Sequence, residues 1–171
     1  MRTKRILLEG AIYHVTARAN HKERLLESYQ ARDLFIDTMS KMRAKEDCRI
    51  IDFVVMENHV HLVIQPRGES SLSSCMKWLL GVYTMRYNSE FQAWGTVWGG
   101  RFYSRPLVGI GGLATAISYV DRNPVRASLV EKPEDWEWGG LFLRRSGREE
   151  AMGPAPEWLP LVAPEHTRDG S

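Results

Sequence analysis

The sequence predicts an α+β fold, a ferredoxin-like (RRM-like) sandwich in which helices cover an antiparallel sheet mainly on one face. Two observations predict it. Segments rich in β-branched and aromatic residues alternate with segments of helical spacing, in the order β-α-β-β-α-β. Only Glu57-Asn58 separates the second and third strand segments, and so short a connection implies an antiparallel hairpin.

The first half of the chain predicts one strand, one helix and this hairpin. Residues 11–18 are rich in β-branched and aromatic side chains, which favour a strand. Apolar residues recur at helical spacing between 29 and 46 and predict the first helix. Residues 49–56 and 59–65 form the two strands of the hairpin.

The next part predicts a second helix and a fourth strand. Ser71 or Ser73 is a suitable N-cap for this helix, whose apolar residues continue to Tyr87. Residues 101–108 again favour a strand. These elements complete the β-α-β-β-α-β order.

The last part predicts a short helix followed by irregular structure. Gly109–Gly112 indicates a flexible joint, and a helix over 113–122 should end near Pro124. Beyond Pro133 the chain becomes rich in Pro, Gly and charged residues, which predicts irregular structure with a disordered end from Ala163. We therefore expect one domain over residues 1–145 and an irregular C-terminal tail over residues 146–171.

Composition restricts the location and the partner. No apolar run approaches the roughly 20 residues needed to span a bilayer, and the apolar run near the N-terminus is too short for a signal peptide. Cys48 and Cys75 lack C-x-x-C spacing and fit reduced thiols in the cytoplasm. Residues 1–130 carry 18 Lys and Arg against 12 Asp and Glu, and this basic body favours a polyanionic partner.

The most informative short motif is a pair of histidines in the third strand segment. His59 and His61 are two residues apart, so their side chains share one face of the strand while Val60 points to the other. Two imidazoles placed in this way can hold one divalent metal ion. The alternative is a pair of histidines with only local hydrogen bonds on a sheet surface.

A second motif lies on the predicted helix near Pro124. Tyr119 and Asn123 are four residues apart and therefore share one helical face. A phenol can attack phosphorus and form a phosphotyrosine, and an asparagine carbonyl can add an oxygen ligand to a metal. Alternatively, Tyr119 is a core residue and Asn123 caps the helix. Tyr83 and Tyr87, also four apart, are the rival nucleophiles, although their apolar neighbours favour core packing.

Basic residues are concentrated near this second motif. Residues 97–130 contain four arginines and a single acidic residue, Asp121. These side chains either form a solvated face or contact phosphates. The candidate phosphate contacts are Arg18, Lys22, Arg24, Arg101, Arg105, Arg122 and Arg126.

Five segments together resemble a known family. They follow in the family's order: Tyr13 to Asn20, Val55 to Leu62 with N-H-V-H-L, Gly99 to Phe102, Tyr119 to Val130 with N-P-V-R-A, and Trp136 to Trp138. Over about residues 8–142 the chain resembles the single-tyrosine HUH transposases, and among these the REP-associated tyrosine transposases. One departure is Gly139-Gly140, where the family often has a pair of serines.

The resemblance implies a role for each motif. His59 and His61 match the metal ligands, Asn123 the third polar ligand, and Tyr119 the catalytic tyrosine. The metal would be Mg²⁺ or Mn²⁺. The substrate would be single-stranded DNA, often beside a palindromic hairpin, cleaved through a 5′-phosphotyrosine with release of a 3′-OH.

Several points stay open at the level of sequence. The glycines before the tyrosine helix would let it move, or let a second subunit of a homodimer supply it. A DNA enzyme of this kind would lie in the cytoplasm near the nucleoid, without membrane contact. A non-catalytic nucleic-acid-binding module of the same fold and a metal hydrolase of small phosphoesters are the alternative functions.

Overall fold

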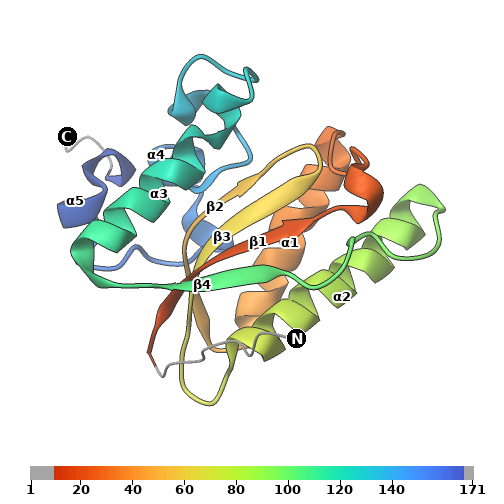
Figure 1. Ribbon diagram of the computed structural model, residues 1–171, viewed down its shortest axis with the longest axis horizontal. Coiled ribbons are helices and arrows are strands. Elements are labelled where there is room, and N and C mark those ends of the chain that lie inside the picture. Colours follow the sequence, from red (N-terminus) through yellow and green to blue (C-terminus); the bar gives the residue numbers. More distant parts are fainter. Residues whose placement is uncertain (1–9, 168–171) are drawn as a thin grey trace.

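The computed structural model describes residues 10–167, which form a four-stranded sheet with helices on both faces. The elements up to α3 follow the predicted order (Figure 1): β1 (Ile12–Arg18), α1 (Tyr29–Lys45), β2 (Cys48–Val55), β3 (His59–Pro66), α2 (Leu72–Phe91), β4 (Tyr103–Leu107) and α3 (Gly109–Arg126). Two short helices, α4 (Gly140–Arg145) and α5 (Leu159–Val162), form in the part that was expected to be irregular. Four short 3₁₀ helices lie between or after them: η1 (Asn20–Lys22), η2 (Pro133–Asp135), η3 (Glu149–Ala151) and η4 (Pro164–His166).

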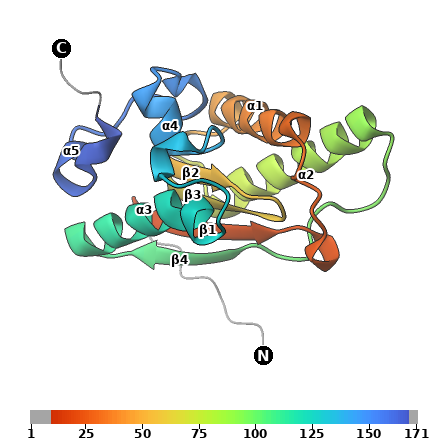
Figure 2. The ribbon, with the colours of Figure 1, turned by 90° about the horizontal axis from the view of Figure 1, so that it is seen from above.

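The sheet has the strand order β2-β3-β1-β4, and every neighbouring pair is antiparallel. Helices α1 and α2 cover one face, and α3 lies across the other (Figures 1 and 2). The predicted ferredoxin-like sandwich is therefore confirmed, with α3 as the helix on the second face.

The two faces differ because side chains alternate along each strand. On β1, Tyr13, Val15 and Ala17 are buried in the hydrophobic core, whereas His14 and Thr16 alternate with them. The register of β1 with β3 pairs Thr16 with His61 and therefore places polar groups of both strands together. This polar set lies on the face that carries α3.

Serine side chains begin the two helices of the core face. The Ser28 side chain accepts a hydrogen bond from the Ala31 N–H at the start of α1. At the start of α2, Ser71 and Ser74 cap each other's backbone N–H groups in a capping box. Ser71, and not Ser73, is thus the N-cap of the second helix.

Helix α3 is longer than predicted at both ends. It begins at Gly109, whose φ of +67° suits glycine, so the expected flexible joint forms its first turn. At the other end, Pro124 is buried inside the helix, which continues to Arg126. A late proline removes one backbone donor, and burial of Ile117 and Val120 holds the helix on the sheet despite this loss.

The segment after residue 145 packs against the domain. It consists of turns and short helices, and Met152, Leu159 and His166 are buried. The prediction of disorder from Ala163 is wrong for residues 163–167, because Ala163 and His166 pack into the interior. Residues 168–171 lie outside the described residues, as does the basic N-terminus before Gly10. No helix of the described part is both long and apolar enough to cross a membrane.

Candidate metal and nucleic-acid site

The two predicted metal ligands lie side by side on β3. The ring centroids of His59 and His61 are 5.0 Å apart, and the ring planes stand at 86° to each other. Both rings project from the sheet face that α3 covers, as the alternation of strand side chains predicts. The structure therefore brings the two imidazoles together.

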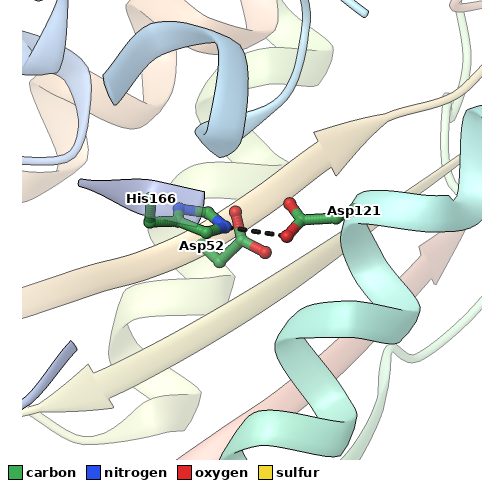
Figure 3. A group of neighbouring side chains, drawn as sticks. All are labelled: Asp52, Asp121 and His166. Atoms are coloured by element: carbon green, nitrogen blue, oxygen red, sulfur yellow. Dashed lines mark hydrogen bonds and ion pairs between the residues drawn. The ribbon is translucent and has the colours of Figure 1, made fainter. Parts of the chain in front are cut away.

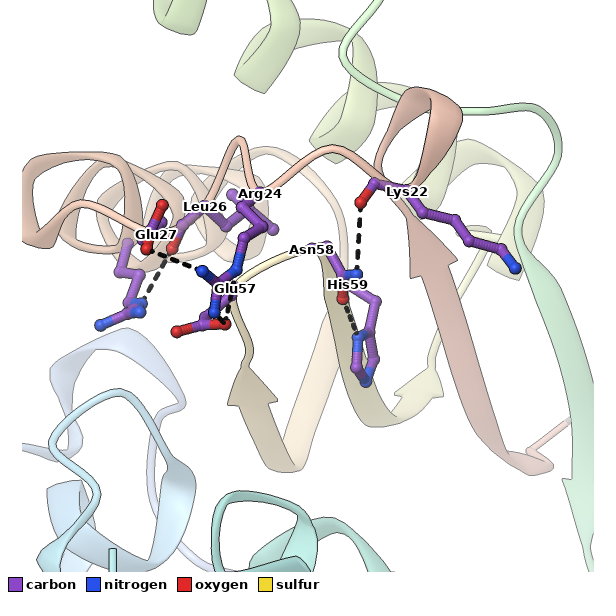
Figure 4. A network of polar contacts seen from close by, with 8 residues as sticks. Lys22, Arg24, Leu26, Glu27, Glu57, Asn58 and His59 are labelled. Carbon is purple, nitrogen blue, oxygen red and sulfur yellow. Dashed lines mark hydrogen bonds and ion pairs between the residues drawn. The ribbon is translucent and has the colours of Figure 1, made fainter. Parts of the chain in front are cut away.

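A hydrogen bond with the preceding residue orients His59. Its Nδ1 lies 2.7 Å from the Asn58 Oδ1 atom (Figure 4). An amide oxygen only accepts hydrogen bonds, so Nδ1 carries the proton and Nε2 keeps its lone pair. Metal-binding histidines adopt the same arrangement: one ring nitrogen donates a hydrogen bond to a nearby acceptor and the other binds the metal.

Two residues of β1 hold His61. Its Nδ1 lies 3.0 Å from His14 Nε2 and 3.1 Å from Thr16 Oγ1. The rings of His14 and His61 stack, with centroids 5.1 Å apart. Because Nδ1 is occupied by these partners, Nε2 is the nitrogen that His61 can offer to a metal.

Burial keeps these imidazoles neutral. It lowers the pKa of His61 to about 3, with smaller effects from His59, His14 and Arg18. Burial, helped by Arg105, lowers the pKa of His14 to about 4. The pKa of His59 is also lowered, mainly by burial and then by Arg18. Neutral imidazole is the form that binds metal.

Tyr119 of α3 lies directly over this group. Its ring meets His61 edge to face at 5.5 Å and His14 at 5.8 Å between centroids. The side chain is 38% exposed, so a substrate can reach it. The Arg126 guanidinium lies 5.1 Å from the centre of the Tyr119 ring.

Asn123 lies one helical turn beyond Tyr119, as predicted. Its Nδ2 donates a 3.1 Å hydrogen bond to the Tyr119 carbonyl, and its side chain also forms a hydrogen bond that raises the pKa of His59. Because Nδ2 donates its hydrogen to the Tyr119 carbonyl, the amide oxygen Oδ1 is the atom that can bind a metal. Two imidazole nitrogens and one amide oxygen form a donor set that fits a divalent cation.

The rival nucleophiles serve the core. Tyr83 is fully buried, and its hydroxyl donates a 2.9 Å hydrogen bond to the Ala31 carbonyl. Burial raises the pKa of Tyr83 and, less strongly, that of Tyr87. Both are on α2, which covers the other face of the sheet (Figure 2).

Three of the predicted basic contacts surround the site. Arg18 is the cross-strand partner of His59, Arg105 is the partner of His14, and Arg126 lies over Tyr119. The other exposed basic candidates are Lys22, Arg101 and Arg122.

Arg24 differs from these because acidic residues hold it. Its Nε donates a 3.0 Å hydrogen bond to Glu57, and Nη1 forms an ion pair with Glu27 at 3.3 Å (Figure 4). These carboxylates raise the pKa of Arg24. A phosphate would have to compete with them.

Sequence reasoning had assigned no role to Asn58 or Thr16. Asn58 directly precedes His59, so its position in the motif was a usable signal. Thr16 becomes a partner of His61 only through the register of β1 with β3. That pairing joins residues far apart in the chain, and no local pattern reports it.

Comparison with known proteins identifies the family. The model of the family described as "Transposase IS200 like" matches residues 8–121. The chain belongs to the IS200-like transposases. The matched region of this IS200-like transposase contains β1, the His59–His61 pair and Tyr119, and it ends at Asp121. A search of curated proteins found no match.

Two solved structures share the fold. A REP-associated tyrosine transposase bound to a REP hairpin superimposes with a TM-score of 0.72 at 19% identity, covering 90% of this chain and 88% of that chain. A protein from Deinococcus radiodurans R1 described as a transposase gives a TM-score of 0.52 at 18% identity, covering 71% and 97%. At these identities the similarity shows the architecture of this IS200-like transposase.

Proposed function

We propose that this IS200-like transposase nicks and joins single-stranded DNA beside a hairpin by transesterification at Tyr119. The main support is the contact of the Tyr119 ring with His61, which burial keeps neutral. Asn123 lies one helical turn from Tyr119. Family membership supports DNA transposition as the process. The hairpin is supported by the fold shared with the REP-hairpin complex.

In the proposed reaction, the Tyr119 phenolic oxygen attacks the scissile phosphorus and the 3′ oxygen of the DNA leaves. The new phosphotyrosine keeps the energy of the phosphodiester bond, so the reverse attack by a 3′-OH can rejoin strands without ATP. A free tyrosine has a pKa of about 10, so positive charge beside the phenol favours the phenolate that attacks. The Arg126 guanidinium near the Tyr119 ring supplies part of it.

The metal would be held by His59, His61 and Asn123. When bound there, Mg²⁺ or Mn²⁺ would polarise the scissile phosphate and offset its developing charge. Asn58, His14 and Thr16 orient the histidine ligands. Arg18, the cross-strand partner of His59, and Arg105, the partner of His14, would contact neighbouring phosphates of the DNA.

The arrangement supports delivery of the nucleophile within one chain. Tyr119 contacts the histidines of its own sheet, so a second subunit is not needed to complete the proposed set. A homodimer would be required only if α3 exchanged between subunits. Size-exclusion chromatography with light scattering during cleavage would separate these two arrangements.

The function is tested with labelled single-stranded DNA that carries the palindrome flanking the gene. We expect the wild type to form a covalent adduct and a free 3′-OH with Mg²⁺ or Mn²⁺, and Tyr119→Phe to form neither while still binding the hairpin. Tyr83→Phe is the matched control and should retain cleavage. Equal behaviour of wild type and Tyr119→Phe, with no adduct from either, would contradict the proposal. Metal-independent binding that survives His59→Ala, again without cleavage, would indicate a binding module.

A further inference from the structure

A second polar cluster lies inside the protein and has no part in the proposed reaction. Asp52 of β2, Asp121 of α3 and His166 of η4 point toward one another (Figure 3). Ligand-type atoms of all three lie within 4.8 Å of one another, and His166 Nε2 is 2.8 Å from Asp121 Oδ2. Among residues 10–167 this is the one group of three or more His, Cys, Asp or Glu residues with such spacing.

Asp52 is the unusual member of this cluster. It is fully buried, and neither of its carboxylate oxygens has a hydrogen bond of good geometry to the described residues. Burial and the Asp121 carboxyl raise the pKa of Asp52 far above its ordinary value, and His166, Arg144 and the Phe53 N–H only partly oppose this. A buried carboxylate without a full set of partners is costly, so a further positive partner would stabilise it.

The chain provides room for this carboxylate. A Cβ atom added at Gly140 would overlap Asp52 Oδ1, so only glycine leaves space for the Asp52 side chain. Gly140 therefore leaves room for the acid at position 52.

One nearby cation does not complete the cluster. Arg144 is fully buried, and its Nη1 donates a hydrogen bond to the Ile51 carbonyl instead of to Asp52. The same nitrogen makes a long hydrogen bond of 3.4 Å to His166 Nδ1, in which the guanidinium donates, and metal binding at Nε2 would require this bond to open. Burial raises the pKa of Asp121 as well, so without a bound ion the two carboxyls resist full ionisation inside the protein.

We propose that Asp52, Asp121 and His166 bind a divalent transition-metal ion, Zn²⁺ or Mn²⁺, in a closed structural site. Asp52, Asp121 and Nε2 of His166 supply one donor each, and the second oxygen of Asp52, which has no hydrogen-bond partner, would complete the four donors that structural zinc takes. Carboxylate oxygens combined with imidazole also suit Mn²⁺. This site is separate from the His59–His61 pair and does not rest on the proposed function.

Such an ion would connect three parts of the chain. Asp121 is on the helix of Tyr119, Asp52 is on the sheet, and His166 comes from the C-terminal segment beyond the family match. A bound ion would therefore fix the tyrosine helix to the sheet and hold the C-terminal segment against both. Metal binding and folding stability should be coupled at this site.

The test measures metal stoichiometry in the full-length chain. Chelator-treated protein is dialysed against Zn²⁺ or Mn²⁺ alone, and bound metal is measured by mass spectrometry. Mn²⁺ is run in parallel because thiols such as Cys48 favour Zn²⁺. We expect one equivalent to remain bound in His59→Ala/His61→Ala, and this equivalent to be lost when Asp52→Asn or, independently, His166→Ala is added to that double variant.

Thermal unfolding provides the second readout. Metal should raise the Tm of His59→Ala/His61→Ala but not that of the same double variant when Asp52→Asn or His166→Ala is added to it. Loss of all binding in His59→Ala/His61→Ala, or full retention when Asp52→Asn or His166→Ala is added to it, would overturn the site. Failure of the His59–His61 site alone would leave the Asp52 site intact.

Discussion

The imidazole of His61 and the phenol ring of Tyr119 meet edge to face, with centroids 5.5 Å apart and planes at 87°. The first residue comes from the central part of the sheet and the second from α3 across its polar face. Their contact places an exposed phenol beside a histidine that burial keeps neutral.

Asn58→Ala should weaken metal binding at the His59–His61 pair. The substitution removes the oxygen that accepts the hydrogen bond from His59 Nδ1. This hydrogen bond fixes the orientation of the ring and leaves Nε2 free to bind the metal. Loss of such an orienting partner lowers metal affinity by about 10- to 100-fold. Mn²⁺ titration monitored by electron paramagnetic resonance measures the change, and Asn88→Ala, distant on α2, is the control. An unchanged affinity would mean that Asn58 does not orient the ligand.

Arg18→Ala and Arg105→Ala should weaken hairpin binding more than Arg24→Ala. The first two lie beside the histidines, whereas Glu57 and Glu27 already occupy Arg24. Each lost phosphate contact should reduce the slope of log K against log salt by about 1. Fluorescence anisotropy at several salt concentrations measures this slope. An equal effect of all three substitutions would show that the ion pairs of Arg24 open on DNA binding.

Tyr83→Phe should lower stability at neutral pH and leave cleavage intact. It removes the hydrogen bond to the Ala31 carbonyl, which contributes about 1 kcal/mol. The pKa of Tyr83 is raised in the folded protein, so its contribution is present below the unfolded pKa of about 10 and is lost as the pH rises above it. Urea unfolding between pH 7 and 11 should therefore show a weaker alkaline loss in Tyr83→Phe than in the wild type.

Gly140→Ala should destabilise the protein through Asp52. The added methyl group would overlap the Asp52 carboxylate, and overpacking of this kind costs about 1–3 kcal/mol. In an Asp52→Ala background the same substitution should cost less, because the clashing oxygen is absent. A double-mutant cycle in urea measures this coupling. Independent, additive effects would show that the backbone near Gly140 moves away instead.

Much of the fold could be predicted from local sequence. The two-residue connection at Glu57-Asn58 predicts the hairpin, and apolar spacing predicts α1 and α2 within a few residues. The extent of α3 could not be predicted, because glycines and Pro124 oppose a helix locally. Burial of Ile117 and Val120 against the sheet outweighs that local preference.

The candidate site, like the fold, could be predicted from the sequence only within single elements. Two-residue spacing on a strand determined that His59 and His61 share a face, and four-residue spacing on a helix determined that Tyr119 and Asn123 do. Only the tertiary structure decided that these faces meet, that Thr16 and His14 hold His61, and that Asp52, Asp121 and His166 converge. The physical reason is that periodicity acts within one element. Contacts between elements depend on strand register and on the burial of apolar surface, which bring together residues that are distant in the chain.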